Sequence, residues 1–261
     1  MDKFKKYIEL NKICWDQRTA LHLNSNFYDN NKFIINKNSL NSIELNMLGD
    51  VEGKSILHLQ CHFGQDSISL AKLGAQVTAV DFSSKSITVA NELAKKMKVK
   101  VKFIESNVLD LDLNKKFDLV FSSYGIVGWI PDLKKWGAVI SKHLKKQGRF
   151  LLTEFHPFFE AIKQNGYNYF YNEKPDIEIS NKSYTESKSK NVLKSCWWNH
   201  SLTDIFIGLE SNNLKLNKFE EFDYSPYKLD GMIEKSKKKY ILKKRFKLST
   251  PYVYNLEAIK K

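Results

Sequence analysis

The chain of 261 residues has a hydrophobic content of 42% and a formal net charge of +13, which supplies enough apolar side chains for one α/β domain with a cap. No apolar run approaches the roughly 18 residues of a membrane span, and the first residues lack the apolar segment of a signal peptide. Cys14, Cys61 and Cys196 are far apart, without disulfide or metal-binding spacing. We therefore expect a cytoplasmic protein with reduced thiols, no metal and no membrane partner.

Residues 1–50 are predicted to form an N-terminal helical cap. Ile8, Ile13 and Trp15 fall loosely on one helical face, and residues 39–48 are amphipathic, so two or three short helices are expected. Such a segment can lie over a ligand that is bound to the domain behind it.

Residues 51–159 alternate apolar strands with helical segments, as in a doubly wound, Rossmann-like α/β sheet. Residues 200–261 are expected to complete a seven-stranded sheet, and 1–261 to form a single domain. The predicted strands are 55–59, 76–80, 100–105, 117–122, 148–154, 215–223 and 246–254.

The first predicted strand and the loop after it indicate a nucleotide-cofactor site. The loop ends at Gly64, where a missing side chain lets the backbone approach a ligand. The second strand leads to Asp81, at the position where such folds bind the two ribose hydroxyls of an adenosine. The alternative for Asp81 is an ordinary helix N-cap.

The loop also narrows the class of cofactor. A dinucleotide site needs Gly-x-Gly-x-x-Gly, and a P-loop needs Gly-Lys-Ser/Thr. Neither occurs here, because Gln60 and His62 occupy the first two expected glycine positions. A cofactor without phosphates is therefore favoured.

At 59–66 the chain reads Leu-Gln-Cys-His-Phe-Gly-Gln-Asp, and here it resembles the class I S-adenosylmethionine-dependent methyltransferases, in particular a bacterial group with this loop. The resemblance implies S-adenosyl-L-methionine as cofactor and S-adenosyl-L-homocysteine as product. The sequence departs from the family at His58, where relatives carry an acid, so Asp66 or a backbone carbonyl is expected to bind the cofactor's ammonium group. Further matching blocks span nearly the whole chain: 15–18, 27–29, 117–120, 123–125, 129–132, 148–150, 154–157 and 198–201.

The resemblance also gives residues 160–199 a role. They are rich in Asn, Ser, Lys and Tyr and contain Pro175, and so long a loop in a compact domain is usually functional or disordered. In the family, an insertion after the fifth strand helps to close the acceptor pocket. We therefore interpret this segment as a β-hairpin cap.

Ligands of an open α/β sheet bind beyond the carboxyl ends of its strands. This rule and the resemblance together place Asp81 at the ribose, Phe82 and Val108 on the two faces of the adenine, and Asn107 at its edge, the alternative for Asn107 being a turn residue. The other expected cofactor-binding residues are Trp15, Arg18, Tyr28, Gln60, Cys61, Gly64, Asp66 and Ser123.

Methyl transfer from a sulfonium is an in-line displacement in which positioning carries most of the rate effect. A base is needed only if the acceptor arrives protonated. His156 is the leading candidate for this base, and its alternative is a turn histidine before Pro157. Other residues are expected to line the acceptor pocket or, alternatively, to belong to the core: His22, Tyr124, Trp129, Trp198 and His200.

Residues 228–261 contain eleven Lys or Arg against three acids and so carry +8 of the net charge. This run is an RNA-binding surface or, alternatively, a solvated face.

We expect methylation of a heteroatom, S, N or O, of a small-molecule acceptor. The alternatives are an RNA methyltransferase that uses the basic tail and a regulator that binds the cofactor without catalysis. The chain lacks the Asn/Asp-Pro-Pro-Tyr motif and an RNA-binding domain, so nucleic acid is not the expected partner; a monomer and a homodimer both fit.

Overall fold

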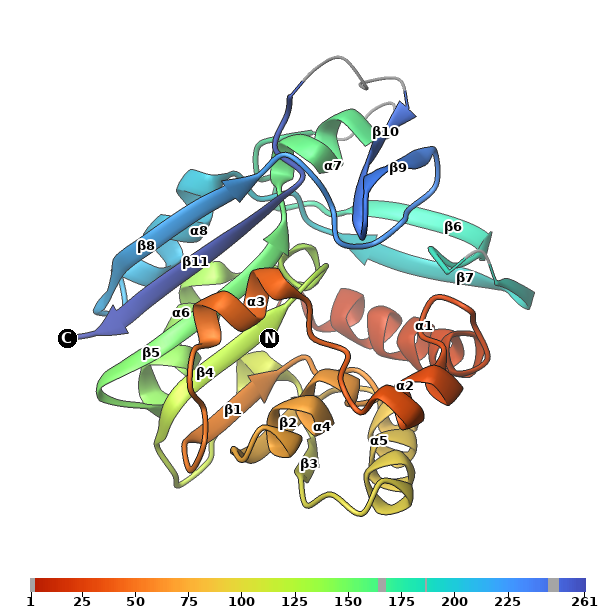
Figure 1. Ribbon diagram of the computed structural model, residues 1–261. Helices are drawn as coiled ribbons and strands as arrows, with labels where there is room; N and C mark the ends of the chain where they lie inside the picture. Colours follow the sequence, from red (N-terminus) through yellow and green to blue (C-terminus); the bar gives the residue numbers. More distant parts are fainter. Residues whose placement is uncertain (1–2, 164–167, 186, 244–248) are drawn as a thin grey trace.

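The centre of the computed structural model, which describes residues 3–163, 168–185, 187–243 and 249–261, is a seven-stranded mixed sheet (Figure 1). Its order is β3-β2-β1-β4-β5-β11-β8, and β11 runs antiparallel to the other six strands. This is the Rossmann-like sheet that the sequence predicted. Its strands are β1 (Ser55–Leu59), β2 (Gln76–Asp81), β3 (Lys102–Glu105), β4 (Phe117–Ser123), β5 (Leu144–Phe155), β8 (Leu214–Phe222) and β11 (Val253–Lys260).

Helices cover both faces of this sheet. Ile56 packs in the core beneath α3 and α4, whereas Leu57 and Leu59 pack in the core beneath α6 and α8, because side chains alternate along a strand. All five residues of β1 are buried, as is typical of parallel strands between two helical layers. The helices are α1 (Lys5–Leu23), α2 (Asn30–Asn36), α3 (Ser42–Leu48), α4 (Gln65–Lys72), α5 (Ser84–Lys96), α6 (Leu133–His143), α7 (Pro157–Lys163) and α8 (Leu202–Glu210), with short 3-10 turns η1 (Val108–Asp110) and η2 (Val127–Trp129).

The last strand differs from the prediction of 246–254, whose first three residues lie outside the described chain. It begins at Val253, after Pro251, which has no N–H to donate to a strand ladder. The strand then continues through Asn255 and Glu257, two polar side chains that are buried because β5 supplies their partners. Their polarity hid this strand from a pattern based on apolar residues.

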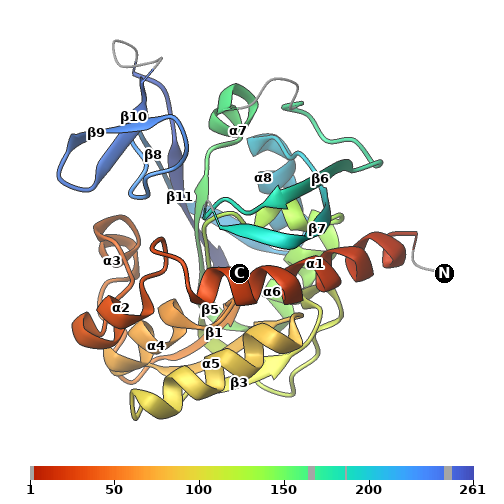
Figure 2. The same cartoon turned by 90° about the vertical axis from the view of Figure 1, so that its right-hand side faces the viewer.

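The N-terminal cap and the insertion lie side by side (Figure 2). The expected β-hairpin is present as β6 (Asp176–Lys182) and β7 (Lys188–Trp197), and α1 packs along it. With 19 residues, α1 is longer than the short helix that we expected. A second hairpin, β9 (Met232–Ser236) and β10 (Lys239–Leu242), carries much of the basic tail. None of the helices in the described ranges is both long enough and apolar enough to cross a membrane.

Candidate active site

The winding of the parallel strands reverses between β1 and β4, which is where open α/β sheets bind their ligands. Two loops meet there, 60–64 after β1 and 124–126 after β4. The side chain of Gln60 connects them, since its amide donates to the Ile126 carbonyl at 3.1 Å. These loops form the floor of the candidate site.

The first loop has the backbone of a glycine-rich loop with few of its glycines. Gln60 and His62 have φ values of 55° and 50°, a left-handed conformation that is uncommon for residues with a side chain. Gly64 has φ +81°, and a Cβ there would lie 2.7 Å from the ring of Phe103. Gly64 therefore allows α4 to pack closely on β3, a role separate from the expected approach to a ligand.

Asp81 points from the end of β2 into this loop. Its carboxylate accepts the amides of His62 at 2.8 Å and Ser83 at 2.9 Å. Burial raises the pKa of Asp81 to about 6. Ser83 caps α5, because its hydroxyl accepts the Ser86 amide. Asp81 is therefore not the N-cap of this helix, which removes the alternative considered for it.

Several buried polar atoms of the described chain lack a hydrogen-bond partner, and two of them belong to the first loop and to α1. One is the acceptor Oε1 of Gln60 and the other is the donor Nε of Arg18 on α1. Buried polar groups nearly always have partners, so these two atoms are candidates for contact with a ligand. The Arg18 guanidinium also lies 5.5 Å and 5.3 Å from the ring centroids of Trp15 and Trp129.

Trp15 brings α1 over the floor of the site. Its ring lies edge-on to His62 and to Trp129, with centroids 5.2 Å and 5.3 Å away. Two turns later along α1, His22 also contacts the first loop. Its Nδ1 lies 2.9 Å from His62 Nε2 and its Nε2 lies 2.6 Å from the Ser183 hydroxyl. Burial lowers the pKa of His22 to about 2 and that of His62 to about 3, so both rings are neutral at physiological pH.

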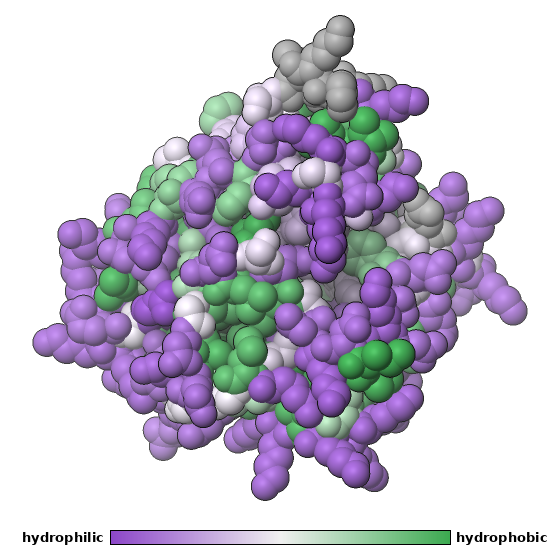
Figure 3. All heavy atoms as spheres, in the orientation of Figure 1, coloured by the Kyte–Doolittle hydropathy of each residue, from purple (hydrophilic) through white to green (hydrophobic). Residues whose placement is uncertain are grey.

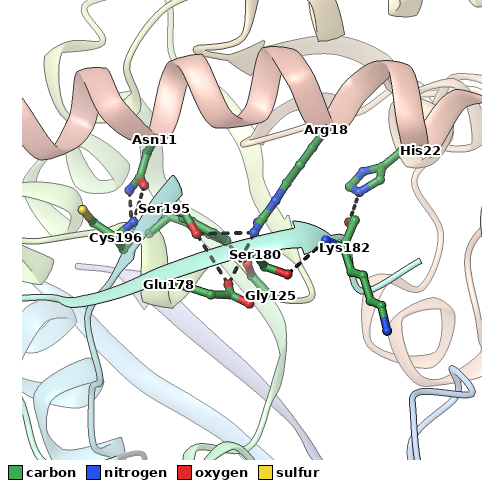
Figure 4. Close-up of polar contacts among 11 residues, drawn as sticks. Asn11, Arg18, His22, Gly125, Glu178, Ser180, Lys182, Ser195 and Cys196 are labelled. Atoms are coloured by element: carbon green, nitrogen blue, oxygen red, sulfur yellow. Dashed lines mark hydrogen bonds and ion pairs between the residues drawn. The ribbon is translucent and has the colours of Figure 1, made fainter. Parts of the chain in front are cut away.

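Helix α1 is also bonded to the inserted hairpin (Figure 4). Asn11 exchanges two hydrogen bonds with the backbone of Cys196, at 2.9 Å and 2.7 Å. Arg18 Nη2 lies 3.3 Å from the Ser195 hydroxyl and 3.5 Å from a Glu178 carboxylate oxygen. On its other side, α1 reaches the core through Asp16, which accepts the Ser83 hydroxyl at 2.6 Å. The helix thus joins the core and the insertion around the site.

The amino end of α4 lies next to the loop after β4. Asp66 accepts the hydroxyls of Ser39 at 2.5 Å and Ser123 at 2.9 Å, so it links the N-terminal cap to both loops. His58 has a different partner, the Ser67 hydroxyl at 2.7 Å. Tyr28 lies next to the first turn of α4, because its carbonyl accepts a hydrogen bond from the side-chain amide of Gln65 at 2.9 Å.

The ends of β2 and β3 hold the residues expected around an adenine. Asn107 accepts the Leu109 amide at 3.2 Å and donates to Asp110 at 2.8 Å, which matches its alternative as a turn residue. Val108 is buried and Phe82 is half-buried. Cys61 is buried in the neighbouring loop, where its amide donates to the Val80 carbonyl at 2.9 Å, and burial raises the pKa of its thiol.

Tyr124 belongs to a polar cluster that sequence analysis did not anticipate. Its hydroxyl donates to Glu44 Oε2 at 2.8 Å, and the backbone amide of Asn41 donates to Glu44 Oε1 at 2.7 Å. Asn41 in turn donates to the Tyr227 hydroxyl at 3.0 Å. Burial raises the pKa of Glu44 to about 7, with Asp66 as a second cause. The Asn41-x-x-Glu44 spacing is that of a capping box, but the contact with Tyr124 joins residues 80 positions apart.

The two remaining candidate histidines have partners within the fold. His156 accepts the Phe158 amide at 3.0 Å, and its other ring nitrogen faces Glu221 at 2.9 Å. This arrangement matches its alternative as a turn histidine. His200 donates to the Ile130 carbonyl at 2.7 Å and stacks on Tyr171. Together with Trp198, it lines a small cavity of about 40 Å³ behind the loop after β4.

This geometry agrees with comparisons to known proteins. Residues 50–206, more than half of the chain, match the protein family described as a methyltransferase domain. The chain belongs to the class I S-adenosylmethionine-dependent methyltransferases. The enzyme is also similar in fold to an S-adenosylmethionine-dependent methyltransferase from Clostridium acetobutylicum, with a TM-score of 0.59 over 91% of this chain and 93% of that one at 18% identity.

Two curated relatives resemble the methyltransferase over part of their length. A ubiquinone biosynthesis O-methyltransferase of Rickettsia conorii is 27% identical over 41% of this chain and 37% of that protein. A cypemycin N-terminal methyltransferase of Streptomyces is 30% identical over 39% of this chain and 42% of that protein. The chain thus matches less than half the length of each relative, and the two relatives carry names with different acceptors.

The two orphaned atoms provide a test of whether the residues present fit S-adenosylmethionine. The methionine part of this cofactor has an ammonium group, which can donate to Gln60 Oε1, and a carboxylate, which can accept from Arg18 Nε. Both atoms are buried. Gln60 belongs to the loop whose His62 amide donates to Asp81, and the Arg18 guanidinium lies over the ring of Trp129, just after β4. The residues therefore fit the cofactor.

Proposed function

We propose that this methyltransferase transfers a methyl group from S-adenosylmethionine to a heteroatom of a small-molecule acceptor in a pocket closed by α1 and the β6–β7 hairpin. The observation that carries the proposal is the convergence of Asp81, Gln60 Oε1 and Arg18 Nε at the switch point, beneath a helix that is bonded to the insertion. A pocket assembled from core and caps suits a ligand that is small enough to be enclosed.

Three residues would bind different parts of the cofactor. Asp81 accepts hydrogen bonds from the ribose hydroxyls, Gln60 accepts from the ammonium group, and Arg18 donates to the carboxylate. When bound, the cofactor supplies an activated methyl group on a sulfonium. Trp15 and Trp129 exclude water above the loops, which strengthens electrostatic interactions inside the site. The protein thus contributes chiefly alignment and desolvation.

The direct test incubates the protein with labelled S-adenosylmethionine and a panel of small thiols, amines, phenols and carboxylates. We expect label in one chemical class of acceptor, and S-adenosylhomocysteine should bind in calorimetry. The proposal is wrong if the folded protein does not bind S-adenosylhomocysteine. Binding without transfer to any member of the panel would favour the alternative of a non-catalytic regulator.

Substitutions in the basic β9–β10 hairpin can distinguish a small-molecule acceptor from an RNA substrate. Replacing Lys237, Lys238 and Lys239 by glutamine should leave methyl transfer to a small acceptor unchanged, and RNA binding should be weak and without sequence preference. If RNA were the substrate, log K would fall by about 0.7 to 0.9 per neutralised phosphate for each decade of salt. The matched control replaces the exposed Lys95 and Lys96 at the end of α5. Loss of turnover in the hairpin variant alone, with cofactor binding kept, would support RNA.

Helix α1 is expected to exchange its amides more slowly when the cofactor is bound, because Trp15, Arg18 and Tyr28 then close over it. Hydrogen exchange across residues 10–30, with and without S-adenosylhomocysteine, measures this. Helix α6, which carries none of the residues expected at the cofactor, is the internal control. Equal protection in both states would mean that α1 is a fixed brace held by its bonds to Cys196 and Ser83.

A further inference from the structure

A set of aromatic rings surrounds the loop after β4 on the side of the N-terminal cap. Tyr124 lies edge-on to Tyr227 at 4.9 Å, and Tyr227 stacks on Phe27 at 5.5 Å. Phe27 contacts Tyr28 and Tyr184 at 5.1 Å and 5.6 Å, and the hydroxyls of these two tyrosines are hydrogen-bonded to each other. We call these five residues the acceptor wall. Figure 3 shows this side of the molecule recessed below the side chains of the β9–β10 hairpin.

Two carboxylates adjoin the acceptor wall. Glu44 is only 1% exposed and accepts the Tyr124 hydroxyl at 2.8 Å. Asp66, half-buried, accepts the Ser123 hydroxyl next to Tyr124. In a chain of net charge +13, no lysine or arginine side chain of the described ranges forms a hydrogen bond or ion pair with Glu44, Asp66 or Tyr124. The region is therefore acidic and aromatic although the protein is basic.

The backbone of Tyr124 is held in an unusual conformation. Its φ is +35°, outside the range that residues with a side chain prefer, and its amide is fixed by the Thr153 carbonyl at 2.7 Å. Such outliers persist where the surroundings enforce them, often at functional sites. The conformation directs the phenol toward Glu44, at the edge of the sheet where the cofactor is expected.

We propose that the methyl acceptor is an amine, bound as its ammonium form against the acceptor wall, and that Tyr124 and Glu44 together remove its proton. The inference rests on the proposed function. Aromatic faces and carboxylates attract an ammonium ion, whereas a carboxylate acceptor would be repelled by Glu44 and Asp66. An ammonium ion has no lone pair, so it must lose a proton before its nitrogen can attack.

The proton and electron balance is complete. The ammonium nitrogen gives one proton to the Tyr124 oxygen, and the Tyr124 proton moves to Glu44 Oε2. The freed nitrogen lone pair forms the new N–CH3 bond, while the electrons of the broken S–CH3 bond stay on sulfur, which becomes a neutral thioether. The sulfonium and desolvation both disfavour the charged amine and so make this proton transfer easier.

This arrangement predicts that amine binding and methyl transfer increase as pH rises through about 7, because Glu44 must be ionised and burial raises its pKa to about 7. The groups that face Glu44 are Asp66 on α4, Tyr124 after β4, and Tyr224 and Tyr227 after β8. Two polar groups of β5 and β11 face α3. Asn255 on β11 donates to the Ile43 carbonyl. Arg149 on β5 donates to the Leu48 carbonyl at the end of α3 and is paired with Glu257. Burial or nearby charge raises the pKa of each tyrosine, so none of the tyrosines titrates near pH 7.

The test uses phenethylamine, 3-phenylpropionate, 4-ethylphenol and a phenethyl thiol with the full chain saturated with S-adenosylhomocysteine or labelled S-adenosylmethionine. We expect phenethylamine to bind in calorimetry and to accept label, and phenylpropionate to do neither. Glu44→Gln keeps a capping side chain but should weaken amine binding at least tenfold and remove the rise in rate near pH 7. Tyr124→Phe keeps the ring and should lower the rate by about 100-fold, the scale of a lost acid–base group.

Glu92→Gln, on the exposed face of α5, is the matched control and should behave as the parent. S-adenosylhomocysteine binding must be unchanged in both site variants. If it is retained and the thiol, phenol or carboxylate is labelled in place of the amine, or no amine binds, the amine proposal is wrong while the proposed function stands. If Glu44→Gln keeps the parent's pH profile, Glu44 is only a helix cap. Loss of S-adenosylhomocysteine binding by the parent would instead contradict the proposed function.

Discussion

Replacing Glu154 by alanine is expected to lower the free energy of unfolding by about 3 kcal/mol or more, because several buried amides would lose an acceptor and each hydrogen bond to a charged group contributes about 1.5 to 3 kcal/mol. Glu154 is 4% exposed, at the end of β5. Its carboxylate accepts the amides of Ile126 at 2.7 Å, Val127 at 3.0 Å and Phe155 at 2.6 Å, and also that of Gly125. Without it, these donors would be left buried and unpaired, and the loop after β4 would lose its anchor.

Thermal unfolding measures this effect, with an expected drop in Tm of about 10 °C for a chain of this size. Glu154→Gln retains one acceptor oxygen and should lose less stability than Glu154→Ala. Glu210→Ala, at the exposed end of α8, is the control and should leave Tm unchanged. An unaltered Tm for Glu154→Ala would show that the amides find other acceptors.

Replacing Asp81 by alanine should raise the Kd for S-adenosylhomocysteine by about 100-fold or more. Two ribose hydroxyls would each lose a hydrogen bond to a charged acceptor, worth about 1.5 to 3 kcal/mol, and tenfold in Kd corresponds to about 1.4 kcal/mol. Calorimetry on the folded variant is the measurement. Asp112→Ala removes an exposed carboxylate and should bind as the parent does. Equal affinity for Asp81→Ala would place the cofactor elsewhere.

The affinity should also depend on pH through the same residue. Because burial raises the pKa of Asp81 to about 6, its carboxylate is charged above pH 6 and becomes protonated below it. Binding of S-adenosylhomocysteine should therefore weaken as pH falls from 7 to 5. His22 and His62 have pKa values of about 2 and 3 and do not titrate in this interval. Asp81→Asn should show a flat profile.

The sheet could be predicted from sequence because its strands are short apolar runs with turns between them. β1, β2 and β4 match the prediction to within one residue. β11 did not, since Asn255 and Glu257 are polar and yet buried, and partners on β5, β8 and α3 make that possible. A pattern of apolar residues depends on the chemical type of each side chain. It does not contain the hydrogen-bond partner on another strand that allows a polar side chain to be buried.

The same limit applies to the candidate site. Asp81 could be predicted because its place follows from strand and loop, which are local in sequence. Glu44, Tyr184 and Tyr227 were missed, because they meet Tyr124 and Tyr28 only after segments far apart in the chain have packed. For His156 the same limit works in the opposite direction. The sequence suggested a catalytic base, whereas the tertiary structure gives its ring a partner in Glu221 on β8.

The bonds of α1 also set an order in which the molecule can assemble. Asn11 and Cys196 are 185 residues apart, and Arg18 and Glu178 are 160 apart. At about 5 to 20 residues per second, a ribosome needs roughly 10 to 40 seconds after α1 to produce its partners on the insertion. During that interval α1 can contact only the core, through Trp15 and Asp16. The nascent chain thus completes β1 to β5 before α1 can be bonded to the insertion, whereas β8 and β11 of the same sheet follow later still.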